Sequence, residues 1–122
     1  MLQLSWYGQS TMARANYTGT YPGDWPAIAR NVKQAAGWKC ERCGVPHGPA
    51  PAMLTVHHLD NDKSNTEAWN LAALCQRCHL QIQHRVDMFQ EYMFEHTPWM
   101  QPHVEGRNRA IESGQWPREF RT

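Results

Sequence analysis

The sequence lacks any long apolar run. No stretch approaches the roughly eighteen consecutive apolar residues that a membrane-spanning helix needs, and the N-terminus does not combine a basic start with an apolar segment as a signal peptide does. From these features we expect a cytoplasmic protein without membrane contact.

The sequence also has no large excess of positive or negative charge. Twelve Lys and Arg stand against eleven Asp and Glu, which gives a formal net charge of +1. Such a balance excludes a strong overall field that would attract the chain to nucleic acid. Contact with DNA would therefore depend on a local basic patch or on a bound cation.

Apolar residues are too few for a large core, at 41% of 122 residues. One compact domain is expected, and a small core of this kind usually needs further stabilisation. The four cysteines form two close pairs. In a reducing compartment such pairs are metal ligands more often than disulfides.

The hydrophobic pattern predicts helices on either side of a short hairpin. Residues 1–22 show no periodicity, so we expect a flexible N-terminal arm. A first helix should begin after Asp24, a residue type favoured as N-cap, tolerate Pro26 in its first turn and end at Gly37.

After this helix, the β-forming residues 53–58 predict a strand, the polar run 60–65 a turn, and residues 69–75 a returning segment. Apolar spacings of three and four residues then predict a helix over about 79–95, which Pro98 ends. A short helix is expected around 103–113. The predicted units are thus the arm 1–22, a domain 23–96, and a C-terminal tail 97–122 that packs on the domain.

The two C-x2-C pairs form the most specific motif. Cys40 with Cys43, and Cys75 with Cys78, each allow a tight turn to direct two sulfurs at one ion, and two such turns complete a tetrahedral four-thiolate zinc site. Alternative interpretations are a redox C-x2-C motif and cysteines without a ligand. Because a closed four-thiolate site has no open position for water, this zinc is expected to be structural.

The segment between the pairs, residues 44–74, exceeds the roughly 15 to 20 residues of a zinc ribbon. It contains His57 and His58, and His79 directly follows Cys78. Since neighbours along a strand point to opposite faces, His57 and His58 are poorly placed to bind one ion side by side, so different roles are expected. Histidines without function remain an alternative, and the preferred one for His47, His96 and His103.

Asn70 lies in the turn before the second cysteine pair. Its side chain could hydrogen-bond the backbone of the polar loop and hold the histidine strand in place. Asparagine is also common in turns without any function.

The order C-x2-C, HH, Asn, C-x2-CH resembles the ββα-metal motif of HNH endonucleases. The matching segments are WKCERCG and LTVHHLDNDKSNTEAWNLAALCQRCH, over about 38–79. The resemblance implies an α+β fold: a small ββα-metal (His-Me finger) domain with a structural four-cysteine zinc site and flanking helices. It also implies that His57 and His79 bind a catalytic divalent metal, that His58 is the general base and that Asn70 orients the loop.

One position departs from some relatives. The colicin nucleases carry a further histidine four residues after the CH histidine, where this sequence has Gln83. His84 follows, about 140° around a helix from His79, so it is a poor candidate for the same ion. We therefore expect a two-histidine site completed by water and phosphate oxygens, which suits Mg²⁺ or Mn²⁺ as well as another divalent metal.

These features predict a DNA endonuclease that nicks double-stranded DNA as a monomer or weak dimer and contacts backbone phosphates. Alternatives are a non-catalytic zinc-containing DNA-binding module and a protein-interaction factor on the same scaffold. Tail tryptophans such as Trp99 and Trp116 are expected to pack on the core. The candidate phosphate contacts are the basic residues Arg30, Lys33, Lys39, Arg42, Lys63, Arg77 and Arg85.

Overall fold

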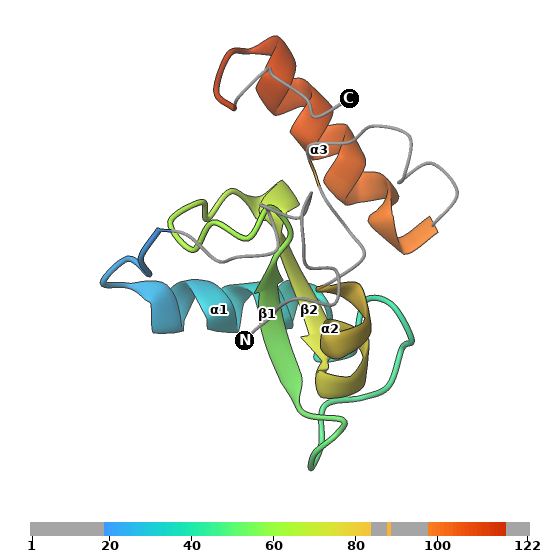
Figure 1. The fold of residues 1–122 in the computed structure, drawn as a ribbon. Coiled ribbons are helices and arrows are strands. Elements are labelled where there is room, and N and C mark those ends of the chain that lie inside the picture. The colour runs from blue at the N-terminus through green and yellow to red at the C-terminus, as the bar shows by residue number, and fades with distance from the viewer. Residues whose placement is uncertain (1–18, 84–87, 89–97, 117–122) are drawn as a thin grey trace, which may run out of the picture.

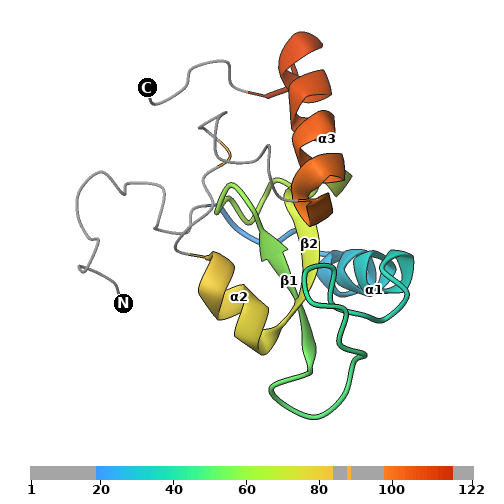
Figure 2. The ribbon, with the colours of Figure 1, turned by 90° about the vertical axis from the view of Figure 1, so that its right-hand side faces the viewer.

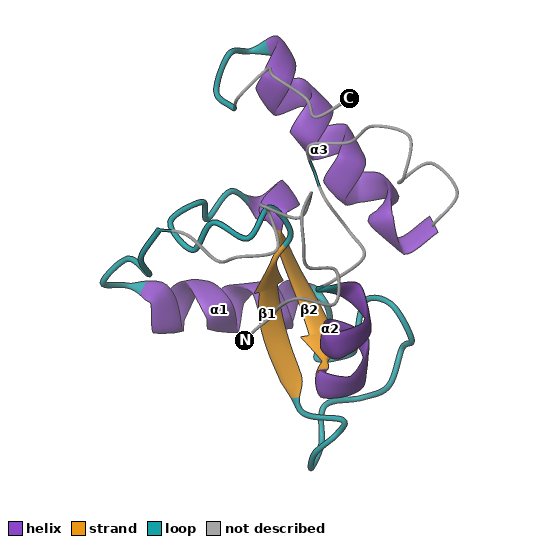
Figure 3. Cartoon of the chain, viewed as in Figure 1, coloured by secondary structure: helices purple, strands orange, loops and turns teal. Residues whose placement is uncertain are grey.

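A computed structural model describes residues 19–83, 88 and 98–116. Its centre is a two-stranded antiparallel hairpin, and helices surround that hairpin (Figures 1 and 3). This architecture confirms the predicted α+β class. Among the described helices, none is long and apolar enough to cross a bilayer. The elements are α1 (Trp25–Ala35), β1 (Leu54–His58), the 3₁₀ helix η2 (Ala68–Asn70), β2 (Leu71–Cys75), α2 (Gln76–Ile82), the 3₁₀ helix η3 (Pro98–Met100) and α3 (Gln101–Glu112).

The hairpin lies between two helices. Helix α1 and helix α2 are on opposite sides of the strands, as Figures 1 and 2 both show. Strand β2 is buried along its whole length, LAALC, which suits a strand covered on both faces. The register pairs Leu54 with Cys75 and His58 with Leu71. Because α1 and α2 lie on opposite sides of the hairpin, each face of β1 is directed at a different helix.

Helix α1 follows the predicted boundaries closely. Asp24 occupies the N-cap position, yet its side chain makes no capping hydrogen bond, which departs from the expectation. Pro26 is accommodated in the first turn, where a helix needs no backbone donor. The helix ends at Ala35, and Gly37 follows with φ of 71°.

Helix α2 begins at Gln76, earlier than the predicted start near His79. The reason is the sulfur of Cys75, which takes the N-cap position and accepts a hydrogen bond from the backbone N–H of Cys78 at 3.4 Å. Most of the remaining predicted helix, at 84–87 and 89–95, lies outside the described residues, and so do His84, Arg85 and His96.

Helix α3 covers the region predicted as a short helix and packs against η2. The two elements approach closely at Gly106, where an added Cβ would lie 2.4 Å from the Cβ of Trp69. The indole of Trp69 also meets the ring of Trp116 edge-on, with centroids 5.1 Å apart. Glycine at position 106 thus permits helix and indole to touch.

We predict that Gly106→Ala destabilises the protein. In an open helix position this change stabilises by up to about 1 kcal/mol, but here the methyl group would overlap Trp69 and overpacking costs about 1–3 kcal/mol. Chemical unfolding measures the effect. Glu105→Ala, on the exposed part of the same helix, is the control and should change stability little. A Gly106→Ala protein as stable as the wild type would contradict the close packing.

Candidate functional site

The four cysteines converge as the sequence predicts. Their sulfur atoms all lie within 4.8 Å of one another, and the sulfurs of Cys43 and Cys75 are 3.8 Å apart. Four thiolates around zinc, with Zn–S bonds of about 2.3 Å, would stand about 3.8 Å apart. The cluster is therefore positioned to bind a metal ion, and its size fits zinc.

Hydrogen bonds stabilise the thiolate of Cys40, whereas burial and the neighbouring thiols oppose the charged form of Cys78. Backbone N–H groups of Cys43 and Cys78 donate to Cys40 and Cys75, each at 3.4 Å. Burial raises the pKa of the Cys40 thiol, but hydrogen bonds from the backbone outweigh it and lower the pKa to about 7. Burial and the neighbouring thiols raise the pKa of Cys78 to about 12. Because neighbouring thiolates repel one another, a cation among the sulfurs would make all four stable as thiolates.

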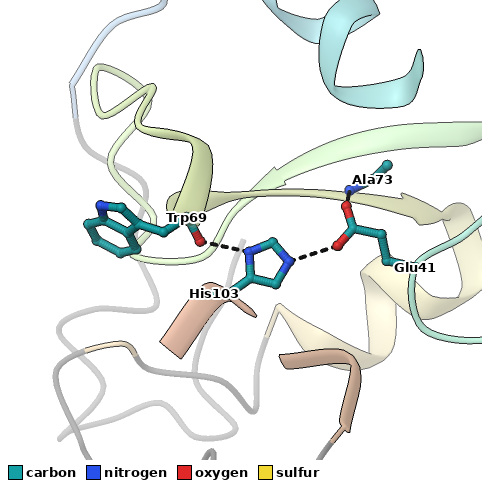
Figure 4. A network of polar contacts seen from close by, with 4 residues as sticks. All are labelled: Glu41, Trp69, Ala73 and His103. Atoms are coloured by element: carbon teal, nitrogen blue, oxygen red, sulfur yellow. Dashed lines mark hydrogen bonds and ion pairs between the residues drawn. The ribbon is translucent and has the colours of Figure 1, made fainter. Parts of the chain in front are cut away.

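A polar network joins this cluster to β2 and α3 (Figure 4). Glu41, between the first two cysteines, accepts a hydrogen bond from the backbone N–H of Ala73 at 2.8 Å. Its other oxygen lies 2.7 Å from Nε2 of His103, and Nδ1 of His103 lies 2.7 Å from the carbonyl oxygen of Trp69. His103 is thus engaged at both ring nitrogens in a structural contact.

The neighbouring histidines of β1 point in different directions. His57 lies against His79 of α2, with ring centroids 4.6 Å apart. His58 instead lies against Trp25 of α1, with centroids 4.9 Å apart. Both histidines are buried. The alternation of side chains along a strand therefore separates them, and it brings His57 together with the first helix turn after the cysteine cluster.

Thr55 shares the His57 face of β1 and contacts His79. Its hydroxyl oxygen lies 2.8 Å from Nδ1 of His79 and donates to the carbonyl oxygen of Leu74 at 2.9 Å. Burial lowers the pKa of His79, and the neighbouring His58 lowers it further. A neutral ring with one nitrogen held in this way is a suitable metal ligand.

His58 has surroundings suited to a neutral base. Burial lowers its pKa, while the carboxylates of Asp60 and Asp62 and a hydrogen bond with the backbone of Lys63 oppose that shift. Among the described residues, Nε2 of His58 has no hydrogen-bond partner. This nitrogen is free to accept a proton.

Two aromatic neighbours of His58 were missed from the sequence. Trp25 begins α1, and Tyr21 belongs to the last residues of the predicted arm, of which 1–18 lie outside the described residues. The Tyr21 ring lies 5.0 Å from that of Trp25 and 5.8 Å from that of His58. The one available signal was an aromatic residue beside a helix start, which alone indicates no partner.

Asn70 fastens the loop that follows His58. Fully buried, it accepts a hydrogen bond from the backbone N–H of Asp60 through Oδ1, and it donates through Nδ2 to the Asp60 carboxylate and the Asn65 carbonyl, all at 2.9 Å. Its own carbonyl accepts from Leu59 at 2.8 Å. The loop after the histidine strand is therefore tied to the start of β2.

The basic residues that the structure describes lie in several places, with Lys63 beside His58 and Arg42 beside the cysteines. Arg42 hydrogen-bonds Cys78 at 3.5 Å and also Gln81, so its guanidinium belongs to the surroundings of the cysteines. Lys63 lies over the Tyr21 ring, 5.3 Å from its centroid. Arg30, Lys39 and Arg77 are exposed, and Lys33 is partly buried on α1.

Comparison with known proteins gives two similarities. Residues 40–85 match the family described as HNH endonuclease. The chain is also similar to the Zorya protein ZorE of Escherichia coli, with 32% identity over 59 residues. That match covers 48% of this chain and 16% of the relative. No solved structure matches the chain.

We predict that Asn70→Asp destabilises the protein at neutral pH although the two side chains have the same shape. The change replaces the donating Nδ2 with an oxygen facing the Asp60 carboxylate and the Asn65 carbonyl, so the free energy of unfolding should fall by about 2–3 kcal/mol. Chemical unfolding is the measurement. Asn31→Asp, at an exposed position of α1, is the control, and equal stability of the two variants would refute the anchoring role.

Proposed function

Residues 40–85 match the HNH endonuclease family, and from this premise we propose that the chain is a metal-dependent DNA endonuclease that nicks double-stranded DNA. The observation that best supports this proposal is that the two neighbouring histidines of β1 face different helices. The ring of His57 faces His79, while the ring of His58 faces Trp25. Strand β1 thus offers His57, which His79 of α2 completes as a metal-binding pair, and His58 as a separate base.

His57 and His79 would hold the catalytic ion, Mg²⁺ or Mn²⁺, and water and phosphate oxygens would complete its coordination. When bound there, such an ion neutralises charge that develops on the phosphate and on the leaving 3′ oxygen. His58 takes a proton from the attacking water through Nε2, which has no hydrogen-bond partner among the described residues. Asn70 acts indirectly, since it fixes the loop that follows His58.

The four cysteines would hold a structural zinc. A closed four-thiolate site offers no position for water, so its role is to stabilise the domain. The bound zinc would also fix the position of His79, because Cys78 directly precedes this histidine in α2. Thiols kept as metal ligands suit a reducing compartment, here the cytoplasm of a bacterial or phage-infected cell.

The substrate would be held through its backbone phosphates rather than its bases. With a net charge of +1 the chain has no strong overall field, so exposed Arg30, Lys39 and Arg77 are the preferred phosphate contacts. One such site cuts one strand. A monomer or weak dimer should therefore convert supercoiled plasmid to open circles before linear product appears.

A plasmid-nicking assay tests the endonuclease directly. Purified protein is incubated with supercoiled plasmid, with and without Mg²⁺ or Mn²⁺. Metal-dependent open circles are expected. Binding to DNA without cleavage in either metal would instead favour the non-catalytic DNA-binding module, and neither binding nor cleavage would favour a protein-interaction role.

We expect the zinc to be required for folding. Replacing Cys40 or Cys75 with Ser removes a ligand from a cluster that the small core depends on, so the variant should release zinc and unfold. Elemental analysis and circular dichroism measure both effects. His79→Ala is the control, because it leaves all four sulfurs and should retain zinc. Wild-type protein purified without tightly held zinc would refute this assignment.

Replacing His58 should impair a different property of the protein from replacing His57 or His79. His58→Ala should bind Mn²⁺ and DNA normally while nicking falls by roughly 10²- to 10⁴-fold, the usual contribution of a general base. His57→Ala and His79→Ala should bind Mn²⁺ more weakly, and high Mn²⁺ should restore part of their activity. Calorimetric titration beside nicking rates separates these cases. Loss of Mn²⁺ binding in His58→Ala, with normal binding in His57→Ala, would reverse the two roles.

A further inference from the structure

The hydroxyl group of Thr55 lies between a carbonyl group and a histidine ring. Thr55 stands opposite Leu74 in the β1–β2 register, and its hydroxyl donates to the Leu74 carbonyl oxygen at 2.9 Å. On its other side the same oxygen lies 2.8 Å from Nδ1 of His79. One side chain thus connects β2 to the first turn of α2.

The proton count of this contact determines the state of the ring. A hydroxyl group has one hydrogen to donate, whereas a carbonyl oxygen can only accept. For both contacts to be hydrogen bonds, the hydrogen of Thr55 goes to Leu74 and the hydroxyl oxygen accepts from His79. Nδ1 of His79 must therefore carry a proton, and in the neutral ring the lone pair is on Nε2.

The nitrogen that carries this lone pair is buried. Among the described residues, nothing hydrogen-bonds Nε2 of His79, and the ring of His57 lies beside it with centroids 4.6 Å apart. A histidine binds a metal ion through an unprotonated nitrogen, and a hydrogen bond at the other nitrogen fixes which one is available.

We propose that Thr55 is the positioning residue for His79: it keeps the proton on Nδ1 and so leaves Nε2 to bind the divalent ion. The inference rests on the proposed endonuclease in so far as His57 and His79 form its metal pair. Thr55 itself touches neither the ion nor the substrate.

The position of Thr55 in the strand supports this role. It precedes His57 by one alternation of β1, so the two side chains share the face directed at α2. The paired backbone of β1 and β2 holds the hydroxyl in place. The ring of His79 is thereby fixed by the same hairpin that carries His57.

The test compares wild-type protein with Thr55→Val and Thr55→Ser in the full-length chain. Valine keeps the branched shape and loses the hydroxyl, and serine keeps the hydroxyl. Two-bond ¹H–¹⁵N correlations, recorded without added Mg²⁺ or Mn²⁺ and well above the ordinary histidine pKa of about 6.5, report which nitrogen of His79 carries the proton. His79→Ala assigns the signal, and Mn²⁺ affinity is measured by calorimetry.

Wild-type protein and Thr55→Ser should have the proton on Nδ1 and similar Mn²⁺ affinity. Thr55→Val should lose the fixed tautomer and bind Mn²⁺ about 10- to 100-fold more weakly. A wild-type ring protonated at Nε2, a wild-type protein that binds no Mn²⁺, or a folded Thr55→Val protein with unchanged affinity would each overturn the proposal. Should Thr55→Val fail to fold, the wild-type tautomer and the Thr55→Ser affinity still decide it. Failure to nick plasmid would count against the endonuclease alone, because neither readout depends on cleavage.

Discussion

The alternation of side chains along β1 is the constraint on which the site depends. Successive residues of a strand face opposite sides, so His57 meets α2 and His58 meets α1. A slip of one residue in the pairing with β2 would exchange these faces. The chemistry assigned to the two histidines therefore exists only in one register.

Several buried contacts hold this register from both ends of the hairpin. At one end Leu54 pairs with Cys75, which belongs to the cysteine cluster. At the other end Asn70 joins the loop after His58 to the start of β2. Glu41 hydrogen-bonds the edge of β2 at Ala73. The cysteine cluster and Asn70 thus act on the same small sheet.

Helix α3 extends this support beyond the residues of the family match. His103 connects the Trp69 carbonyl to the Glu41 carboxylate, and Gly106 allows the helix to lie directly against Trp69. Trp116 adds a hydrogen bond from its indole to Asp60 at 3.3 Å. Residues 98–116 therefore pack on the turn that carries Cys40 and Cys43 and on the loop that Asn70 anchors.

Local patterns in the sequence predicted the hairpin, the converging cysteines and the separation of His57 from His58, because short-range spacing governs all three. Contacts between distant segments could not be predicted. Nothing near Trp25 in the sequence indicates His58, and His103 lies far along the chain from Glu41. Thr55 gave no signal either, since threonine is common in strands. The start of α2 was placed too late because a cysteine sulfur, not a usual capping residue, begins the helix.

We propose that this small hairpin supports two separate metal sites, the four cysteines and the pair of His57 with His79, and keeps His58 apart from both. Anomalous diffraction from crystals of the zinc-loaded protein soaked in Mn²⁺ tests it most directly. The account predicts a zinc peak among the four sulfurs, with Zn–S distances of about 2.3 Å, and a manganese peak bonded to ring nitrogens of His57 and His79. A manganese ion bonded to His58, or none near His57 and His79, would contradict it.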